Sequence, residues 1–226
     1  MGEWTTLPVE GGPMRAYIAG RAQAKGSGIL VLQEAFGVNA HIREMTDRFA
    51  SAGYLAIAPE LFHRTAPGFE GDYQNFSTAM PHLQALTAAG QEADLRACQA
   101  WLAGQGAERL VAAGFCLGGR VAVRAAGVIP LAAAASFYGG NWERMEAILP
   151  QARCPLLLAW GDRDDHIPVD QRAQMSALLR AGHQPFVELT FSDAGHGFMC
   201  DARAAFHAPS AKMAWPLLLA FLQETA

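Results

Sequence analysis

The chain has 226 residues, of which 51% are hydrophobic and 17% charged, and its formal net charge is -4 at pH 7. This composition supplies a sizeable core and excludes a disordered chain, and the mild negative charge argues against a nucleic-acid partner. The sequence has neither an apolar run long enough for a membrane span nor a basic start followed by an apolar stretch, so we expect a cytoplasmic protein.

Strand-like runs alternate with helix-like runs, with no linker-like segment or internal repeat between them. This alternation predicts a single α/β domain over residues 1–226, with a mostly parallel central sheet and helices on both faces. The predicted strands, the first of them antiparallel, are residues 14–18, 28–33, 54–58, 110–115, 131–138, 155–160 and 185–191. The predicted helices are 41–52, 91–104, 117–126, 142–149, 171–181 and 210–223; residues 62–80 have no clean period and are predicted as an irregular loop near the site. Pro216 should kink the last helix or mark a late start.

The four cysteines are Cys98, Cys116, Cys154 and Cys200. Their spacings fit neither CxxC metal sites nor a dense disulfide framework. We therefore expect reduced thiols, with no metal and no cofactor.

The most informative segment is Gly114-Phe115-Cys116-Leu117-Gly118-Gly119, where a predicted strand ends and a predicted helix begins. It is the G-x-S-x-G nucleophile elbow of the α/β-hydrolase fold, with cysteine in the serine position. The start of a helix favours a thiolate and an oxyanion, so we predict that Cys116 is the nucleophile and that the N–H of Leu117 is one oxyanion donor. The alternative is a buried cysteine that packs as a small hydrophobic residue.

A thiol nucleophile needs a base, and the base needs an orienting acid. In this fold the chain order is nucleophile, acid, histidine. Asp162, Asp164 and Asp165 follow the strand 155–160 and compete for the acid position. His196 follows the last strand between two glycines and is the predicted base, with His166 as a weaker rival.

Glu34 follows the otherwise apolar strand 28–33. A carboxylate at that edge would point into the same crevice as Cys116, although a simple loop acid before a glycine turn is the alternative. The loop after this strand supplies the second oxyanion N–H in the α/β-hydrolase fold, and we assign that N–H to Ala35.

With these residues in place, the chain resembles the dienelactone hydrolase family from about Gly28 to its C-terminus. The resemblance is carried by QEAFG at 33–37, PELFHRTAPG at 59–68, GFCLGG at 114–119 and AGHGF at 194–198. The acid of this family lies in a G-x-x-D-x-x-(V/I)-P pattern, which laid over residues 161–168 selects Asp164. The resemblance implies hydrolysis of a small activated ester or lactone by a Cys116–His196–Asp164 triad through an acyl-enzyme.

The resemblance also implies a role for Glu34, which in this family pairs with the resting cysteine. It places Phe36 and Tyr138 near the pocket and assigns the substrate carboxylate to arginines, of which Arg64 matches one. A second arginine is expected where Cys200 stands, and a third within residues 73–80, which contain none; Arg203 is a candidate substitute.

Three other functions remain open. A general carboxylesterase or thioesterase of the same fold would explain the missing arginines, a non-catalytic ligand-binding member would show a broken triad, and a redox thiol protein would need a resolving cysteine. We expect a small-molecule substrate and a monomer, with a homodimer as the alternative.

Overall fold

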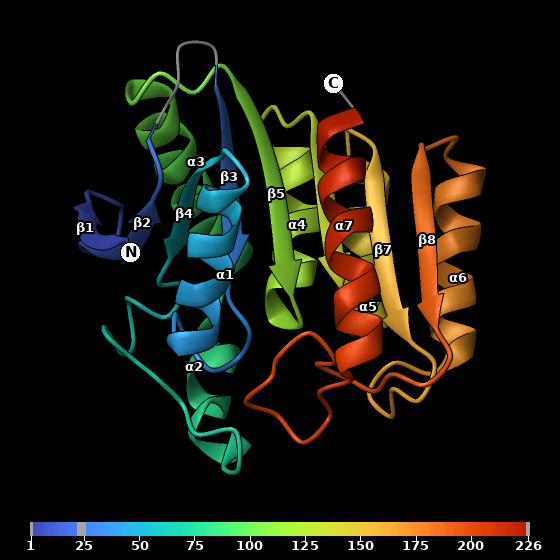
Figure 1. The fold of residues 1–226 in the computed structure, drawn as a ribbon. Helices are drawn as coiled ribbons and strands as arrows, with labels where there is room; N and C mark the ends of the chain where they lie inside the picture. The colour runs from blue at the N-terminus through green and yellow to red at the C-terminus, as the bar shows by residue number, and fades with distance from the viewer. Residues whose placement is uncertain (1, 22–25, 225–226) are drawn as a thin grey trace. The chain divides into compact units, whose positions relative to one another are not determined.

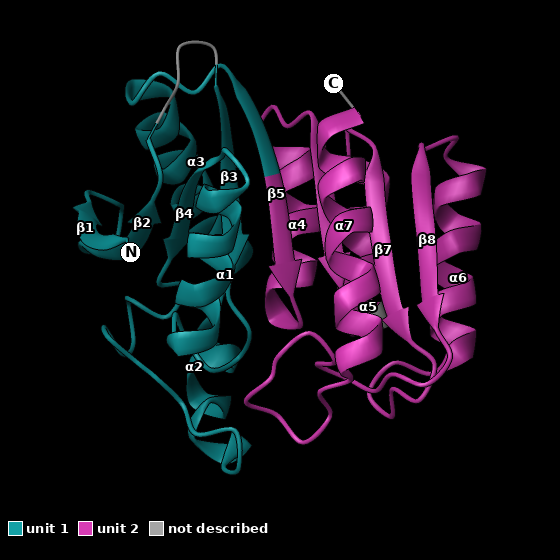
Figure 2. Cartoon of the chain, in the orientation of Figure 1, with its two compact units in different colours: residues 1–111 teal, residues 112–226 magenta. Residues whose placement is uncertain are grey.

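The computed structural model describes residues 2–21 and 26–224, which divide into two compact units, residues 1–111 and 112–226 (Figure 2). The boundary falls within one strand, β5 (Arg109–Phe115). The prediction of a single domain therefore stays a prediction.

The first unit is built on strands in the order β1-β2-β4-β3, where β1 and β2 run antiparallel to their neighbours and β3 and β4 are parallel. Helices α1 and α3 pack on this part of the sheet, and Figure 1 shows α1 in front of the strands and α3 behind them. The antiparallel strand predicted at residues 14–18 is confirmed, whereas β1 was not predicted. The elements are β1 (Glu3–Leu7), β2 (Met14–Ala19), β3 (Ser27–Leu32), α1 (Ala40–Ser51), β4 (Leu55–Pro59), η1 (Phe76–Thr78), α2 (Met80–Ala85) and α3 (Ala88–Gly104).

The second unit carries parallel strands β6, β7 and β8 beside the end of β5. Helices α4 and α7 both pack on β6, and Figure 1 shows α7 in front of the strands and α4 behind them. Helix α5 then packs on α4, and α6 packs on α5. The elements are β5 (Arg109–Phe115), α4 (Leu117–Val128), β6 (Ala133–Phe137), α5 (Trp142–Ile148), η2 (Leu149–Gln151), β7 (Leu156–Gly161), α6 (Val169–Ala181), β8 (Phe186–Phe191) and α7 (Ala208–Glu224).

Together these strands form an eight-stranded, mostly parallel sheet in the order β1-β2-β4-β3-β5-β6-β7-β8, the predicted α/β-hydrolase architecture. No helix of the described residues combines the length and the apolar character that a membrane crossing requires.

Two local predictions need correction. Residues 62–80 are not wholly irregular, because η1 and the first residue of α2 lie within them. Pro216 does not mark a late start, because α7 begins at Ala208 and continues through it. Its missing N–H costs one helical hydrogen bond, but buried Ala214 and Leu218 on either side anchor the helix by packing.

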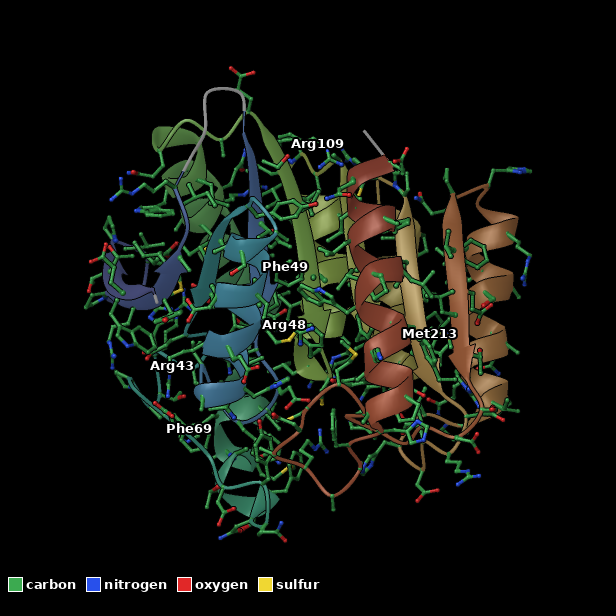
Figure 3. The ribbon with its side chains drawn as sticks, viewed as in Figure 1. Arg43, Arg48, Phe49, Phe69, Arg109 and Met213 are labelled. Atoms are coloured by element: carbon green, nitrogen blue, oxygen red, sulfur yellow. The ribbon has the colours of Figure 1, made fainter. Side chains whose placement is uncertain are left out.

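The buried core of each unit explains why its elements form. Strands β3, β4 and β7 are apolar and almost fully buried along their whole length, as expected for strands covered on both faces. In α1, the residues Ile42, Met45 and Phe49 follow helical spacing and are buried. Phe49, labelled in Figure 3, meets the ring of Tyr54 edge-on at 6.1 Å between centroids.

A buried ion cluster in the first unit joins α3 to the segment after β4. The carboxylate of Asp94, fully buried on α3, accepts two hydrogen bonds from Arg64, at 2.8 and 3.0 Å. It also lies 3.1 Å from Nε2 of the buried His63. Arg64 donates further to the carbonyl of Glu10, so its guanidinium is held inside the unit.

Replacing Asp94 with alanine should destabilise the fold strongly. The substitution leaves the Arg64 and His63 side chains without their buried acceptor, and breaking a buried pair from one side costs about 3–5 kcal/mol. The free energy of unfolding in urea measures the effect. Arg96→Ala, at an exposed position on the same helix, should change it by less than about 0.5 kcal/mol; equal effects of the two variants would contradict a structural role for the cluster.

Candidate active site

The turn between β5 and α4 holds Cys116 in a strained conformation. Its φ is +54°, in a region that non-glycine residues rarely adopt. A side chain at Gly114 would collide with the carbonyl of Gly118, and one at Gly119 would lie within 2.7 Å of Ser136 Oγ and 2.8 Å of Gly139 Cα. The N–H of Cys116 donates to the carbonyl of Phe137 on β6 at 3.0 Å. These glycines and this bond allow the strand to turn directly into the helix with the sulfur at the turn.

The loop after β7 carries Asp164. One carboxylate oxygen of Asp164 accepts from the backbone N–H groups of His166 at 2.8 Å and Ile167 at 3.2 Å. Of the two competing acids, Asp162 pairs with Arg172 on α6 at 3.0 Å, and Asp165 is exposed. Only Asp164 of the three is therefore both buried and turned toward the predicted base.

The loop after β8 carries His196, and backbone contacts tie it to the acid loop. The N–H of Asp162 donates to the carbonyl of Phe191, and the N–H of Arg163 donates to that of Ala194, both at 2.9 Å. A side chain at Gly161 would strike the carbonyl of Ala194. Acid and base thus stand on two loops that hydrogen bonds fix to each other.

The structure brings Cys116, His196 and Asp164 into one hydrogen-bonded chain. Nε2 of His196 lies 3.2 Å from Sγ of Cys116, and Nδ1 lies 2.8 Å from the second oxygen of Asp164. The aromatic rings of Tyr138 and His166 flank the imidazole, with centroids at 5.2 and 4.7 Å. Tyr138 is fully buried, and its own φ is +40°.

The electrostatics of this chain favour a charged imidazole. Burial alone would lower the pKa of His196, but the negative charge of the Cys116 thiolate and the hydrogen bond to Asp164 outweigh it and raise the pKa to about 10. A cationic His196 beside the sulfur is the arrangement that activates a thiol nucleophile. Burial raises the pKa of the Cys154 thiol to about 11 and raises that of Cys98 as well, so these two thiols are poor nucleophiles and poor redox partners.

Four other predicted site residues have defined positions in the structure. Leu117 is the first residue of α4, where N–H groups have no acceptor within the helix. Glu34, Ala35 and Phe36 follow β3 and are buried. The ring of Phe36 lies 4.6 Å from that of Tyr73. The roles of these residues stay predictions.

Two arginines matter for an anionic substrate. Arg64 already holds Asp94 and the Glu10 carbonyl, so a substrate carboxylate could bind it only in competition with Asp94. Arg203, half-buried in the second unit, packs its guanidinium against Gly197, the residue after His196. Gly197 has φ +86°, and any side chain there would strike this guanidinium.

His166 is a close neighbour of the predicted base, a relation that its sequence position did not establish. Its ring contacts that of His196, and its N–H donates to Asp164. Its position two residues after the acid was the available signal.

Comparison with known proteins gives a consistent result. Residues 14–226 match the profile of the "Dienelactone hydrolase family". A "Putative carboxymethylenebutenolidase" of Escherichia coli K12 is 34% identical over 238 residues, covering 98% of this chain and 86% of the relative. One of the same description from Synechocystis is 34% identical over 203 residues, covering 83% and 81%.

Solved structures agree with the sequence relatives. The crystal structure of a "Putative Dienelactone Hydrolase" from Klebsiella pneumoniae is similar with a TM-score of 0.88 and 33% identity, covering 99% of this chain and 98% of that one. A dienelactone hydrolase-like phosphotriesterase, P91, from metagenomic libraries shares the fold at a TM-score of 0.85 and 19% identity, covering 100% and 98%.

The charge on His196 should depend on the sulfur. Cys116→Ala removes the negative charge that raises the pKa of His196, so this pKa should fall from about 10 toward the ordinary value for histidine. The raised pKa of His196 stabilises the folded state fully below the pKa of the unfolded state, near 6.5, and this stabilisation is lost as pH rises through about 10. Between these pH values the parent should therefore lose stability more steeply than the variant. NMR titration of the His196 ring and urea unfolding from pH 6 to 10 measure both effects. An unchanged ring pKa in Cys116→Ala would contradict the charge pairing.

Proposed function

Because the chain belongs to the dienelactone hydrolase family, a family of hydrolases, we propose that it cleaves a small activated ester or lactone through Cys116, His196 and Asp164. The observation that carries the proposal is the hydrogen-bonded chain from the sulfur through the imidazole to a buried carboxylate, with links of 3.2 and 2.8 Å. These are the distances at which a base takes a proton from a nucleophile and an acid orients the base.

The proposed reaction has two stages. In the first, the Cys116 thiolate attacks the carbonyl carbon, the C–O bond to the leaving group breaks, and a thioester to Cys116 forms. Nε2–H of His196 protonates the leaving oxygen, or loses its proton to water where a leaving enolate needs none, and the imidazole becomes neutral. In the second, His196 takes a proton from water as the water attacks the thioester, and the thiolate leaves as the free acid forms. Asp164 accepts from Nδ1 throughout and stabilises the imidazolium.

The carbonyl oxygen becomes negative in both stages and needs hydrogen-bond donors. We assign one donor to the N–H of Leu117 at the start of α4, where the helix dipole adds a favourable positive potential. The second donor, the N–H of Ala35, and the part of Glu34 in generating the thiolate rest on the family resemblance.

The chemistry of sulfur restricts the substrate class. A thiolate leaves a tetrahedral intermediate more readily than an alkoxide does, so attack on an amide or a simple alkyl ester tends to revert. Enol esters, enol lactones, aryl esters and thioesters have better leaving groups and can proceed. The proposal is therefore confined to activated acyl compounds.

Cys116→Ala should lower turnover of an activated aryl ester by at least about 10³-fold, since only oxyanion stabilisation and binding would remain. Initial rates with p-nitrophenyl acetate measure the loss, and mass spectrometry should find the acyl group on Cys116 in the parent. Cys154→Ala is the matched control because its thiol is buried away from the triad, and it should keep parent activity. Near-parent turnover by Cys116→Ala would remove this sulfur from the reaction.

Arg203 is the residue we propose for binding a substrate carboxylate. Its guanidinium packs against Gly197, the residue after His196. Arg203→Gln should raise KM for a lactone that carries a carboxylate by about 10-fold or more, the scale of a lost charge-assisted hydrogen bond. KM for a neutral aryl ester should stay near the parent value.

The control for Arg203 is Arg163→Gln, which removes an exposed arginine paired with Asp193 on the neighbouring loops. It should leave both KM values near those of the parent. If Arg203→Gln changes KM for the anionic and the neutral substrate equally, Arg203 does not bind the substrate carboxylate. A general carboxylesterase or thioesterase activity is then the better description.

A further inference from the structure

His166 lies where it can act on the base without exchanging a proton with the substrate. Its ring stands nearly perpendicular to that of His196, at 79° and 4.7 Å between centroids. Its backbone N–H donates at 2.8 Å to the oxygen of Asp164 that does not bind His196. One residue therefore contacts the base through its ring and the acid through its backbone, while the residue itself is exposed.

The hydrogen bonds of His196 leave one rotation of its ring unfixed. Bonds at Nδ1 and Nε2 set the line that joins the two nitrogens, but the ring can still turn about that line. Contacts with neighbouring rings must oppose this turn, and the rings of Tyr138 and His166 are in contact distance. Tyr138 is itself held by the edge of Phe198 at 5.5 Å, whereas His166 stands on a surface loop.

We infer that His166 is a positioning residue that holds the His196 ring in line between Cys116 and Asp164. The inference rests on the proposed function, since it concerns the same triad. It adds to that function a residue on a surface loop that aligns the base.

Two substitutions at position 166 test whether the ring positions His196. His166→Ala removes the ring and should lower kcat on an aryl ester by about 10-fold, the order expected when a catalytic group loses its alignment, with KM nearly unchanged. His166→Phe restores a ring of similar shape and should recover kcat to within about twofold of the parent. If Phe is as slow as Ala, or if Ala matches the parent, the positioning role is wrong. Thermal melting of each variant confirms that the fold is kept.

The matched control is His183→Asn, which should keep the kcat and KM of the parent. It removes an exposed histidine before β8, at the opposite end of the strand from His196, at a φ of +51° that asparagine tolerates.

Failure of the proposed function would show differently, as undiminished turnover in Cys116→Ala, whatever the rates of the His166 variants.

Discussion

The abrupt turn from β5 into α4 is the constraint on which the site depends. It forces Cys116 to a φ of +54°, and it exists only because Gly114 and Gly119 leave room for the carbonyl of Gly118 and for the β6 side of the sheet. The strained turn places the sulfur at the end of a buried strand and the start of a helix. At this position, free N–H groups and the helix dipole favour negative charge. Strain of this kind persists only where the surrounding structure determines it.

The acid and the base depend on a second constraint, the joining of two loops. Hydrogen bonds between the loops after β7 and β8 fix the backbone on both sides, and Asp164 is further held by two N–H groups of its own loop. A carboxylate that is held in this way need not move when His196 becomes charged. The imidazolium therefore meets an environment that is already arranged for it, which is the condition for electrostatic stabilisation without reorganisation.

Local sequence patterns predicted most of this arrangement, because each pattern has one structural meaning. The alternation of apolar runs predicted the parallel sheet, and the glycines around Cys116 predicted the turn. Edge strand β1 was missed because it is only partly buried, with Trp4 packed on Tyr17 and Arg15 at the surface. The passage of α7 through Pro216 could not be predicted, since packing of the helix decided it. The hydrogen bonds from Arg64 to Asp94 join residues 30 positions apart, so no local sequence pattern could predict them.

The ring contact of His166 with His196 joins residues 30 positions apart and likewise has no local sequence signal. The triad needs three residue types at fixed places, but the rings that align the imidazole need only shape. Tyr138 is buried among aromatic side chains and cannot change without repacking. His166 stands on a surface loop, so its side chain can change while its backbone N–H continues to hold Asp164. Position 166 is thus a place where the alignment of the His196 ring can be altered with little cost to the fold, since surface substitutions usually change stability by less than about 0.5 kcal/mol.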